Sequence, residues 1–343
     1  MSLRIGVIGV GALGRHHVRT VSRTPGAVLV GAYDPHPERA RAVEEHGGRA
    51  YPDARSLIGD AEAVIVASST KSHREVAGAV LDAGKHCLVE KPLADHVDAC
   101  DELVALAARA GVVLHVGHVE RMNAAVRAAR PLIRRPRFIE VRRLAGFTPR
   151  GTDVDVLLDL MIHDLDLVLS WCGAAPASLA AVGVAVLTGG EDIANARLEF
   201  EDGCVADLTA SRVSQEKLRK IRLFQEDAYL SLDCAEGVAE IVEADRPAIA
   251  AAVASGALAM ARGGTQAPAA APPDWSALVR RRALPRPEGD PLTLQLEAFL
   301  RAVRGEAPAP GLEPADGAAG TRAVRVADTI REALRRRSER WRA

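Results

Sequence analysis

Ionisable residues recur at helical spacing in one apolar stretch of the chain. Asp155, Asp159, His163 and Asp166 stand at i, i+4, i+8 and i+11 between residues 155 and 166. At about 100° per residue, these positions fall on one narrow stripe of a helix. An unpaired charge in apolar surroundings is costly, so the stripe must face a solvated cleft, a ligand or compensating partners.

Two residues of this chain are candidates for acid–base chemistry. Asp159 and His163 lie one helical turn apart, so the carboxylate is expected to orient the imidazole and to favour its protonated form. Such a pair suits a general base that takes a proton from an alcohol while hydride leaves its carbon. The alternative is a buried structural Asp–His pair. Lys91 could donate to the same hydroxyl from a cleft, or could simply be a solvated lysine.

A further candidate, His118, follows Gly117 at the end of a predicted strand. Polar residues follow it closely, namely Glu120, Arg121 and Asn123. We expect these side chains to enter the same cleft and to bind substrate. His16, His17 and His36 have no comparable setting and are expected at the surface.

Near the N-terminus, Arg4 to Gly14 reads as a strand, a tight turn and the start of a helix. Gly9 would make the turn, Gly11 would let a pyrophosphate approach the backbone, and Gly14 would let the helix pack on its strand. Ala12 and Leu13 lie at the helix start, where free N–H groups and the helix dipole favour phosphate. A structural turn is the alternative interpretation.

A second apolar run ends at Asp34, which lies 34 − 14 = 20 residues after the last glycine. At that distance a carboxylate would bond the hydroxyls of an adenosine ribose, and its charge would repel a 2′-phosphate. The pattern therefore predicts NAD rather than NADP. Further cofactor contacts are expected in loops that follow later strands: Ser68, Ser69, Thr70, His73, Glu90, Lys91 and Pro92.

The elements that must position these residues change character along the chain. Strands and helices alternate over residues 1–120, which predicts a parallel, doubly wound α/β sheet of the Rossmann type. In such sheets, ligands lie beyond the carboxyl ends of the strands. Period-two runs and hairpin turns in residues 121–315 predict an α+β domain with an open, mostly antiparallel sheet. Residues 316–343 are expected to form a final helix that packs back on the first domain, and 244–291 a poorly packed excursion.

Composition excludes several classes of function. The chain has 343 residues and a net charge of −1, so no basic field favours nucleic acid or an anionic membrane surface. Its five cysteines are scattered, which predicts reduced thiols, no metal site and a cytoplasmic location. We expect no signal peptide and no membrane span.

Four motifs taken together resemble the Gfo/Idh/MocA family of dehydrogenases: Gly9-x-Gly11-x-x-Gly14, Glu90-Lys91-Pro92, Gly117-His118 and Asp159-x-x-x-His163. The resemblance implies a Rossmann domain followed by an open-sheet domain through which subunits pair as homodimers or homotetramers. It also implies that NAD or NADP is used to oxidise or reduce a ring hydroxyl of a sugar, inositol or sugar nucleotide. Lys91 and His163 would then flank the reacting hydroxyl, with Asp159 supporting His163.

Within the family, residues 117–123 and 150–155 resemble bacterial members that oxidise C3 of UDP-N-acetylglucosamine. A diphosphate needs cations, and the candidates are Arg121, Arg143 and Arg150. Met122 and Met161 depart from the family pattern and could alter the sugar pocket. Three alternatives remain open: a dehydrogenase of free sugars or inositols, an NAD-dependent glycosidase, and a non-catalytic nucleotide-sensing regulator.

Overall fold

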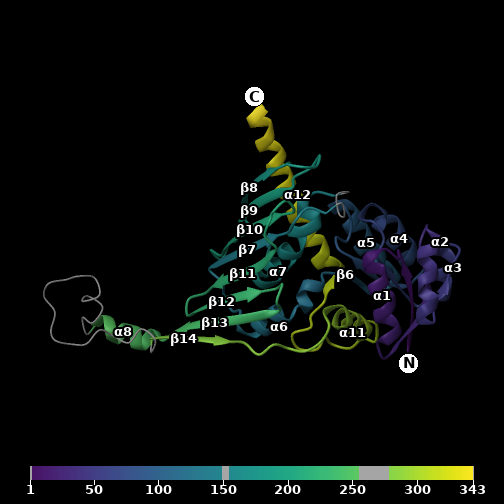
Figure 1. Cartoon of the computed structure of the whole chain (residues 1–343), viewed down its shortest axis with the longest axis horizontal. Helices are drawn as coiled ribbons and strands as arrows, with labels where there is room; N and C mark the ends of the chain where they lie inside the picture. The colour runs from purple at the N-terminus through teal and green to yellow at the C-terminus, as the bar shows by residue number, and fades with distance from the viewer. Residues whose placement is uncertain (1, 149–153, 255–277, 343) are drawn as a thin grey trace.

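The protein contains two sheets, shown in Figure 1. The structure is a computed structural model that describes residues 2–148, 154–254 and 278–342. Arg150 therefore lies outside the described residues, and its expected role stays a prediction.

The first sheet, sheet A, has seven strands in the order β15-β6-β5-β4-β1-β2-β3. All neighbours pair in parallel except β15, which is antiparallel to β6. The order reverses between β1 and β4, as in a doubly wound Rossmann sheet, and confirms the predicted fold of the first domain. Its elements are β1 (Leu3–Ile8), α1 (Ala12–Arg23), β2 (Ala27–Tyr33), α2 (Pro37–Ala40), η1 (Arg41–His46), β3 (Arg49–Ala50), α3 (Ala54–Asp60), β4 (Ala63–Val66), η2 (Thr70–Ser72), α4 (His73–Asp82), β5 (His86–Glu90), α5 (Val97–Ala110) and β6 (Leu114–Gly117).

The central strands of sheet A are apolar on both sides because helices cover both faces. Val7 and Ile65 pack against α1 and against Phe299 of α11 (Pro291–Val303). Val66 and Val89 face the opposite core, which includes Leu81 of α4. Burial on both faces fixes the strands, so the polar loops at their carboxyl ends are held in place.

The second sheet, sheet B, has eight strands in the order β14-β13-β12-β11-β7-β10-β9-β8. Only the β7–β10 pair is parallel, so the prediction of a mostly antiparallel sheet is confirmed. The elements are η3 (Val119–Met122), α6 (Ala124–Ala129), η4 (Arg130–Leu132), β7 (Phe138–Leu144), η5 (Leu157–Met161), α7 (Ile162–Cys172), β8 (Ser178–Val184), β9 (Ile193–Glu199), β10 (Val205–Ser211), β11 (Leu218–Phe224), β12 (Ala228–Asp233), β13 (Val238–Ala244), α8 (Arg246–Ala254) and β14 (Val279–Ala283).

One face of sheet B is covered and the other is open. In β11, Ile221 and Leu223 are buried, whereas Arg222 and Phe224 alternate with them and are exposed. In Figure 1, α6 and α7 lie on the face directed toward sheet A, and no described helix lies on the opposite face. The alternation along the strand therefore reports which face carries the core.

One segment differs from the sequence prediction. The helix expected from Asp153 contains a π-helical turn, η5, before α7 begins. The segment 244–291, expected to be a poorly packed excursion, lies outside the described residues at 255–277. Its described part includes α8 and the edge strand β14, in which every residue is exposed. Arg281 and Arg282 of β14 pair with glutamates of β13, so cross-strand charges hold this edge.

The final helix, α12 (Gly317–Arg342), packs against α5 of the first domain and against α7 and β8 of the second. It begins directly after β15 (Ala315–Asp316), which pairs with β6. None of the helices in the described ranges is long and apolar enough to cross a membrane.

Candidate active site

The glycine-rich turn after β1 requires the absence of side chains. Gly9 has a φ of +89°, and a Cβ there would lie 2.6 Å from the backbone nitrogen of Ser68. A Cβ on Gly14 would lie 1.9 Å from the carbonyl oxygen of Gly9. Gly11 faces open space, and a hollow of about 480 Å³ is lined there by Gly11, Ala12, Arg15 and Arg39. The turn is tight where the chain packs and open where a ligand would approach.

The Asp34 carboxylate fixes this turn to the end of β2. Its Oδ2 accepts a hydrogen bond from the Val10 amide at 2.8 Å, and its Oδ1 accepts one from the His36 amide at 2.9 Å. Each oxygen has a second acceptor site left for a ribose hydroxyl. The hollow at Gly11 is also lined by two arginines that were not predicted as site residues, Arg15 and Arg39.

His73 connects the loops that follow β4 and β5. Its Nδ1 lies 2.8 Å from the Pro92 carbonyl oxygen, and its Nε2 lies 3.2 Å from that of Ser68. The Ser68 hydroxyl accepts a hydrogen bond from Ser72, while Ser69 and Thr70 begin the short helix η2. The peptide bond between Lys91 and Pro92 is cis. His73 therefore braces both strand-end loops from within the fold.

His17 corrects the expectation that it lies at the surface. It is buried, and its Nε2 lies 2.7 Å from Oε1 of Glu90, which is also buried. Oε2 of the same carboxylate accepts the Lys91 amide at 3.3 Å. Gly117 packs against this carboxylate so closely that a Cβ would lie 2.6 Å from Oε2. The pair is hidden in the sequence because its members lie 73 residues apart.

Lys91 reaches across to the helical segment of the second domain. Its Nζ donates to the backbone carbonyl of Asp159 at 2.6 Å and lies 3.8 Å from the carboxylate oxygen Oδ1. Asp159 belongs to the π-helical turn η5, and turns of this kind often occur at functional sites. The structure thus brings Lys91 and Asp159 together, one turn before His163.

His163 has a different electrostatic setting from the one expected. Burial first, and then the nearby positive charge of Lys91, holds its pKa well below the ordinary value. Its Nδ1 is enclosed and has no hydrogen-bond partner among the described residues. The expectation that the protonated form is favoured is wrong, because desolvation and cations outweigh any carboxylate. The imidazole is neutral at neutral pH and can accept a proton.

His118 lies beside His163, with the ring centroids 6.4 Å apart. It is buried, its Nδ1 is unpartnered within the described ranges, and burial lowers its pKa. Two neutral imidazoles and one ammonium group therefore converge at the carboxyl ends of β5 and β6.

The other acidic residues of the stripe pair away from the cleft. Asp155 accepts from Arg331 of α12 at 2.8 Å and from the Leu158 amide at 3.1 Å. Asp166 is buried and holds Arg121 through two bonds of 2.6 Å. Compensating partners, one of the three settings expected, therefore explain both carboxylates.

This arrangement corrects two expected substrate contacts. Arg121 also donates to the Pro314 carbonyl and is almost fully buried, so it is not available for a phosphate. Arg143 is likewise buried on Asp164, with bonds of 2.7 and 2.8 Å. Sequence reasoning identified the arginines but not their partners, because Asp164 lies off the predicted stripe.

Three further residues singled out from the sequence, Asn123, Met122 and Met161, cap a helix or pack in the core. Asn123 caps α6 by accepting the Ala125 amide at 2.9 Å, and its Nδ2 donates to the Cys234 carbonyl. Met122 is buried against Leu294, and Met161 is buried in the main core. Both methionines therefore belong to the packed interior, and their effect on a sugar pocket stays a prediction.

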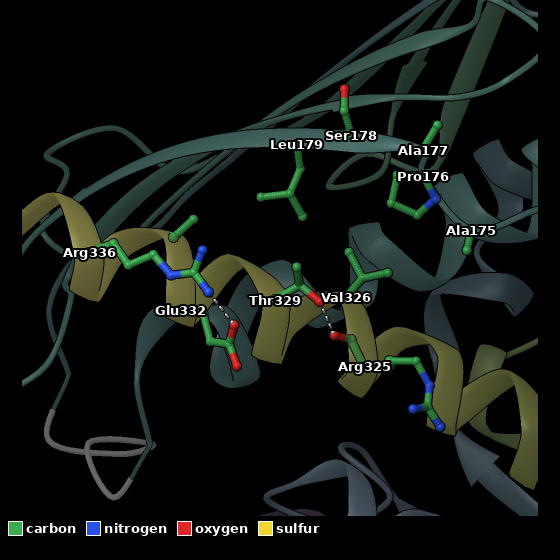
Figure 2. A pocket seen from close by; sticks show the side chains of 11 residues that line it. Ala175, Pro176, Ala177, Ser178, Leu179, Arg325, Val326, Thr329, Glu332 and Arg336 are labelled. Carbon is green, nitrogen blue, oxygen red and sulfur yellow. Dashed lines mark hydrogen bonds and ion pairs between the residues drawn. The ribbon is translucent and has the colours of Figure 1, made fainter.

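A separate hollow lies between β8 and α12, as Figure 2 shows. Leu179 and Val326 form part of its wall, with Thr329, Glu332 and Arg336 along the helix. None of the predicted catalytic, cofactor or substrate residues lines it. This hollow is therefore separate from the candidate active site at the strand ends.

Comparisons with known proteins identify the family of this chain. Residues 3–118 match the model of the oxidoreductase family with an NAD-binding Rossmann fold, and residues 115–231 match that of the GFO/IDH/MocA C-terminal domain. The chain belongs to the Gfo/Idh/MocA family of oxidoreductases. Its two domains and its order of motifs are those implied by the resemblance in the sequence.

Two relatives of this Gfo/Idh/MocA protein are informative. UDP-N-acetylglucosamine 3-dehydrogenase of Acidithiobacillus ferrooxidans is 36% identical, and the alignment covers 97% of each chain. A solved structure of that enzyme superposes with a TM-score of 0.82 at 34% identity, covering 97% of this chain and 98% of the other. Myo-inositol 2-dehydrogenase of Thermotoga maritima is 28% identical over 61% of this chain and 69% of the relative.

Proposed function

We propose that this oxidoreductase transfers hydride between a nicotinamide and the C3 hydroxyl of UDP-N-acetylglucosamine, with NAD as the cofactor. The observation that carries the proposal is the hydrogen bond from Lys91 to Asp159, which places the ammonium group beside the helix that bears His163. The relative that is 36% identical over nearly the full length acts on this substrate.

The residues present fit a bound dinucleotide. Gly11 leaves open space at the start of α1. The free N–H groups of the first helical turn would donate to a phosphate bound there. Asp34 holds the turn and keeps acceptor capacity for a ribose. His73 and the loops after β4 and β5 continue the site toward Lys91. When bound, the nicotinamide supplies the hydride acceptor.

The chain's own residues would handle the proton and the charge. Lys91 donates to the substrate oxygen and stabilises the negative charge that develops on it. His163, neutral because its pKa is lowered by burial, accepts the hydroxyl proton. The Asp159 carboxylate lies 3.8 Å from the ammonium group of Lys91 and helps to hold it in position.

The substrate is tested with a panel of UDP-linked sugars, free sugars and inositols, read by NADH formation. Reduction of NAD with UDP-N-acetylglucosamine alone supports the proposal. Turnover of nucleotide-free sugars or inositols, without turnover of UDP-linked sugars, would instead identify a dehydrogenase of free sugars or inositols. Release of an aglycone without NADH accumulation would identify a glycosidase, and tight NAD binding with no turnover would identify a regulator.

Cofactor preference gives a separate prediction. NAD should bind more tightly than NADP, because the Asp34 carboxylate repels a 2′-phosphate. Asp34→Ser should weaken NAD binding by about tenfold, because a hydrogen bond to a charged group is lost. The same substitution should reduce the difference in Kd between NAD and NADP. Kd values from NADH and NADPH fluorescence titrations measure this.

Arg39 supplies the matched variant, because it has the opposite charge and lines the hollow at Gly11, next to the Val10 amide that Asp34 holds. Arg39→Met should weaken NADPH binding more than NADH binding. Equal Kd values for the two cofactors in the wild-type protein would contradict the assignment of Asp34.

We also propose that the protein forms a homodimer or homotetramer through the open face of sheet B. Phe224 is 39% exposed on this face and stacks on Tyr229, with the ring centroids 4.8 Å apart. The ring centroid of Phe138 lies 5.8 Å from that of Phe224. Phe224→Glu should produce monomers in light scattering. Val28→Glu, at a similarly exposed position in the first domain, should not; monomeric wild-type protein would refute the proposal.

All five cysteines are free thiols, which suits the reducing cytoplasm. We therefore infer that the protein works there.

A further inference from the structure

The candidate site needs a cation that its two described candidate arginines do not supply. Arg121 and Arg143 each hold a buried aspartate through two short bonds. Their side chains are only 8% and 5% exposed, so either would leave a buried carboxylate unpaired if it turned to a ligand. Both arginines balance charge inside the protein.

Arg219 has a different environment. It lies near the start of β11 and shares a strand face with Ile221 and Leu223, which are buried under the covering helices. Its own side chain is 43% exposed. Arg219 therefore starts from the covered face of sheet B and reaches solvent at the rim of that face.

Its position is close to the reacting pair. The positive charge of Arg219 contributes, after burial and nearer cations, to the lowered pKa of His163. The neighbouring strand places Arg143 opposite Arg219 in register, and Arg143 is hydrogen-bonded to Asp164, the residue that follows His163. A ligand that contacts His163 is thus within the field of the Arg219 guanidinium.

The side chain of Arg219 is held loosely. In the described part of the chain, its guanidinium has a single polar partner, Oε1 of Glu120, at 3.5 Å from Nη1. The same oxygen accepts from Arg143 at 3.3 Å. Glu120 would keep Arg143 as its partner if Arg219 moved, so recruiting Arg219 to a ligand leaves no buried charge unpaired.

We propose that Arg219 binds the diphosphate of a nucleotide-linked sugar substrate, which makes it a specificity-determining residue. The inference rests on the function proposed above. A guanidinium offers five N–H donors in a planar fork that matches two phosphate oxygens. In UDP-N-acetylglucosamine the phosphate is attached at C1, which is separated from C3 and its hydroxyl by one ring carbon. When the C3 hydroxyl lies at His163, the diphosphate lies further from that imidazole. The cation that binds the diphosphate should therefore lie near His163 without contacting it.

The test compares Arg219→Met with Arg222→Met. Arg222 lies on the same strand, is 45% exposed and has one described carboxylate partner, Glu140, but it points to the open face of the sheet. Loss of charge-assisted bonds to phosphate should raise the KM for UDP-N-acetylglucosamine by about 10- to 100-fold in Arg219→Met. The value of kcat should stay within about threefold, since the bond is made in both ground and transition states. Arg222→Met should match the wild type.

Binding of UDP alone, measured by calorimetry on the NADH-loaded protein, provides a readout that needs no turnover. Arg219→Met should lose most of the UDP affinity, and Arg219→Lys should regain part of it as a point charge without the fork. If Arg219→Met does not fold, the test uses Arg219→Lys. Weaker UDP binding by Arg219→Lys than by Arg222→Met would support the proposal, and equal binding would contradict it.

The two proposals fail differently. If the wild type oxidises UDP-N-acetylglucosamine and Arg219→Met binds UDP as tightly as Arg222→Met, Arg219 does not read the diphosphate and the proposed function stands. If the wild type oxidises only nucleotide-free sugars and does not bind UDP, the proposed function falls and the role of Arg219 falls with it.

Discussion

Lys91→Met should lower kcat for the true substrate by about a thousandfold while leaving the Kd for NADH within about twofold. The ammonium group lies at the carboxyl end of β5 and bonds the Asp159 carbonyl at 2.6 Å, so it can stabilise charge on a substrate oxygen placed between the domains. Methionine keeps the length of the side chain and removes the charge. The loss should therefore fall on turnover, measured by steady-state NADH formation.

Lys85→Met is the matched control for this experiment. The Nζ of Lys85 also donates to a backbone carbonyl, that of Ala61 at 2.7 Å, but at the opposite end of sheet A. Its replacement should leave kcat unchanged. A Lys91→Met protein that turns over normally, or that loses NADH binding instead of turnover, would show that the chemistry has been misplaced.

His163→Asn should lower kcat by about 100- to 1,000-fold, because it removes the proton acceptor while keeping a polar side chain. The wild-type profile should retain activity at pH 6.5, since a base with a lowered pKa stays deprotonated until the pH falls through that lower value. His96→Asn, at an exposed histidine of the first domain, is the control and should be silent.

The electrostatic cause of this pKa can be tested independently of turnover. Lys91 is the largest contributor after burial, so Lys91→Met should raise the pKa of His163. A titration of the histidine ring resonances by NMR measures the change. A His163 that titrates at its ordinary pKa in the wild type would refute the neutral-base assignment.

Local motifs were the part of the site that sequence could predict. Gly9 and Gly14 are fixed by contacts within a strand–turn–helix unit, so their spacing carries the information. Lys91 and His118 lie at strand ends, and a parallel sheet brings all such ends to one edge. The same logic predicted the doubly wound sheet and the open antiparallel one.

Pairings between distant residues were not predictable in this way. His17 and Glu90 form one buried pair although neither stands in a recognisable charge pattern. The sequence pointed to Arg121 as a phosphate ligand and not to Arg219, but tertiary packing gives the first a buried aspartate and leaves the second nearly half exposed. The partner of a charge depends on which elements pack together, and helical periodicity does not contain that information.

The π-helical turn explains a further difference. An ideal helix would place Asp155, Asp159 and Asp166 along one line, but the turn at 157–161 shifts the residues that follow it. Asp155 precedes the helical segment and bonds to Arg331 of α12, whereas Asp159 lies within the turn and beside Lys91. A single stripe in the sequence became three separate environments.

The return of the chain through β15 and α12 has a consequence for how the protein can be divided. The edge strand of sheet A comes from residues 315–316, and the helix that follows shields apolar surface of both halves at once. A fragment ending near residue 120 would expose the unpaired edge of β6 and the side of α5 that α12 covers. Both exposed surfaces would promote aggregation. We therefore expect the first domain to need residues 315–342 in order to fold as a soluble unit.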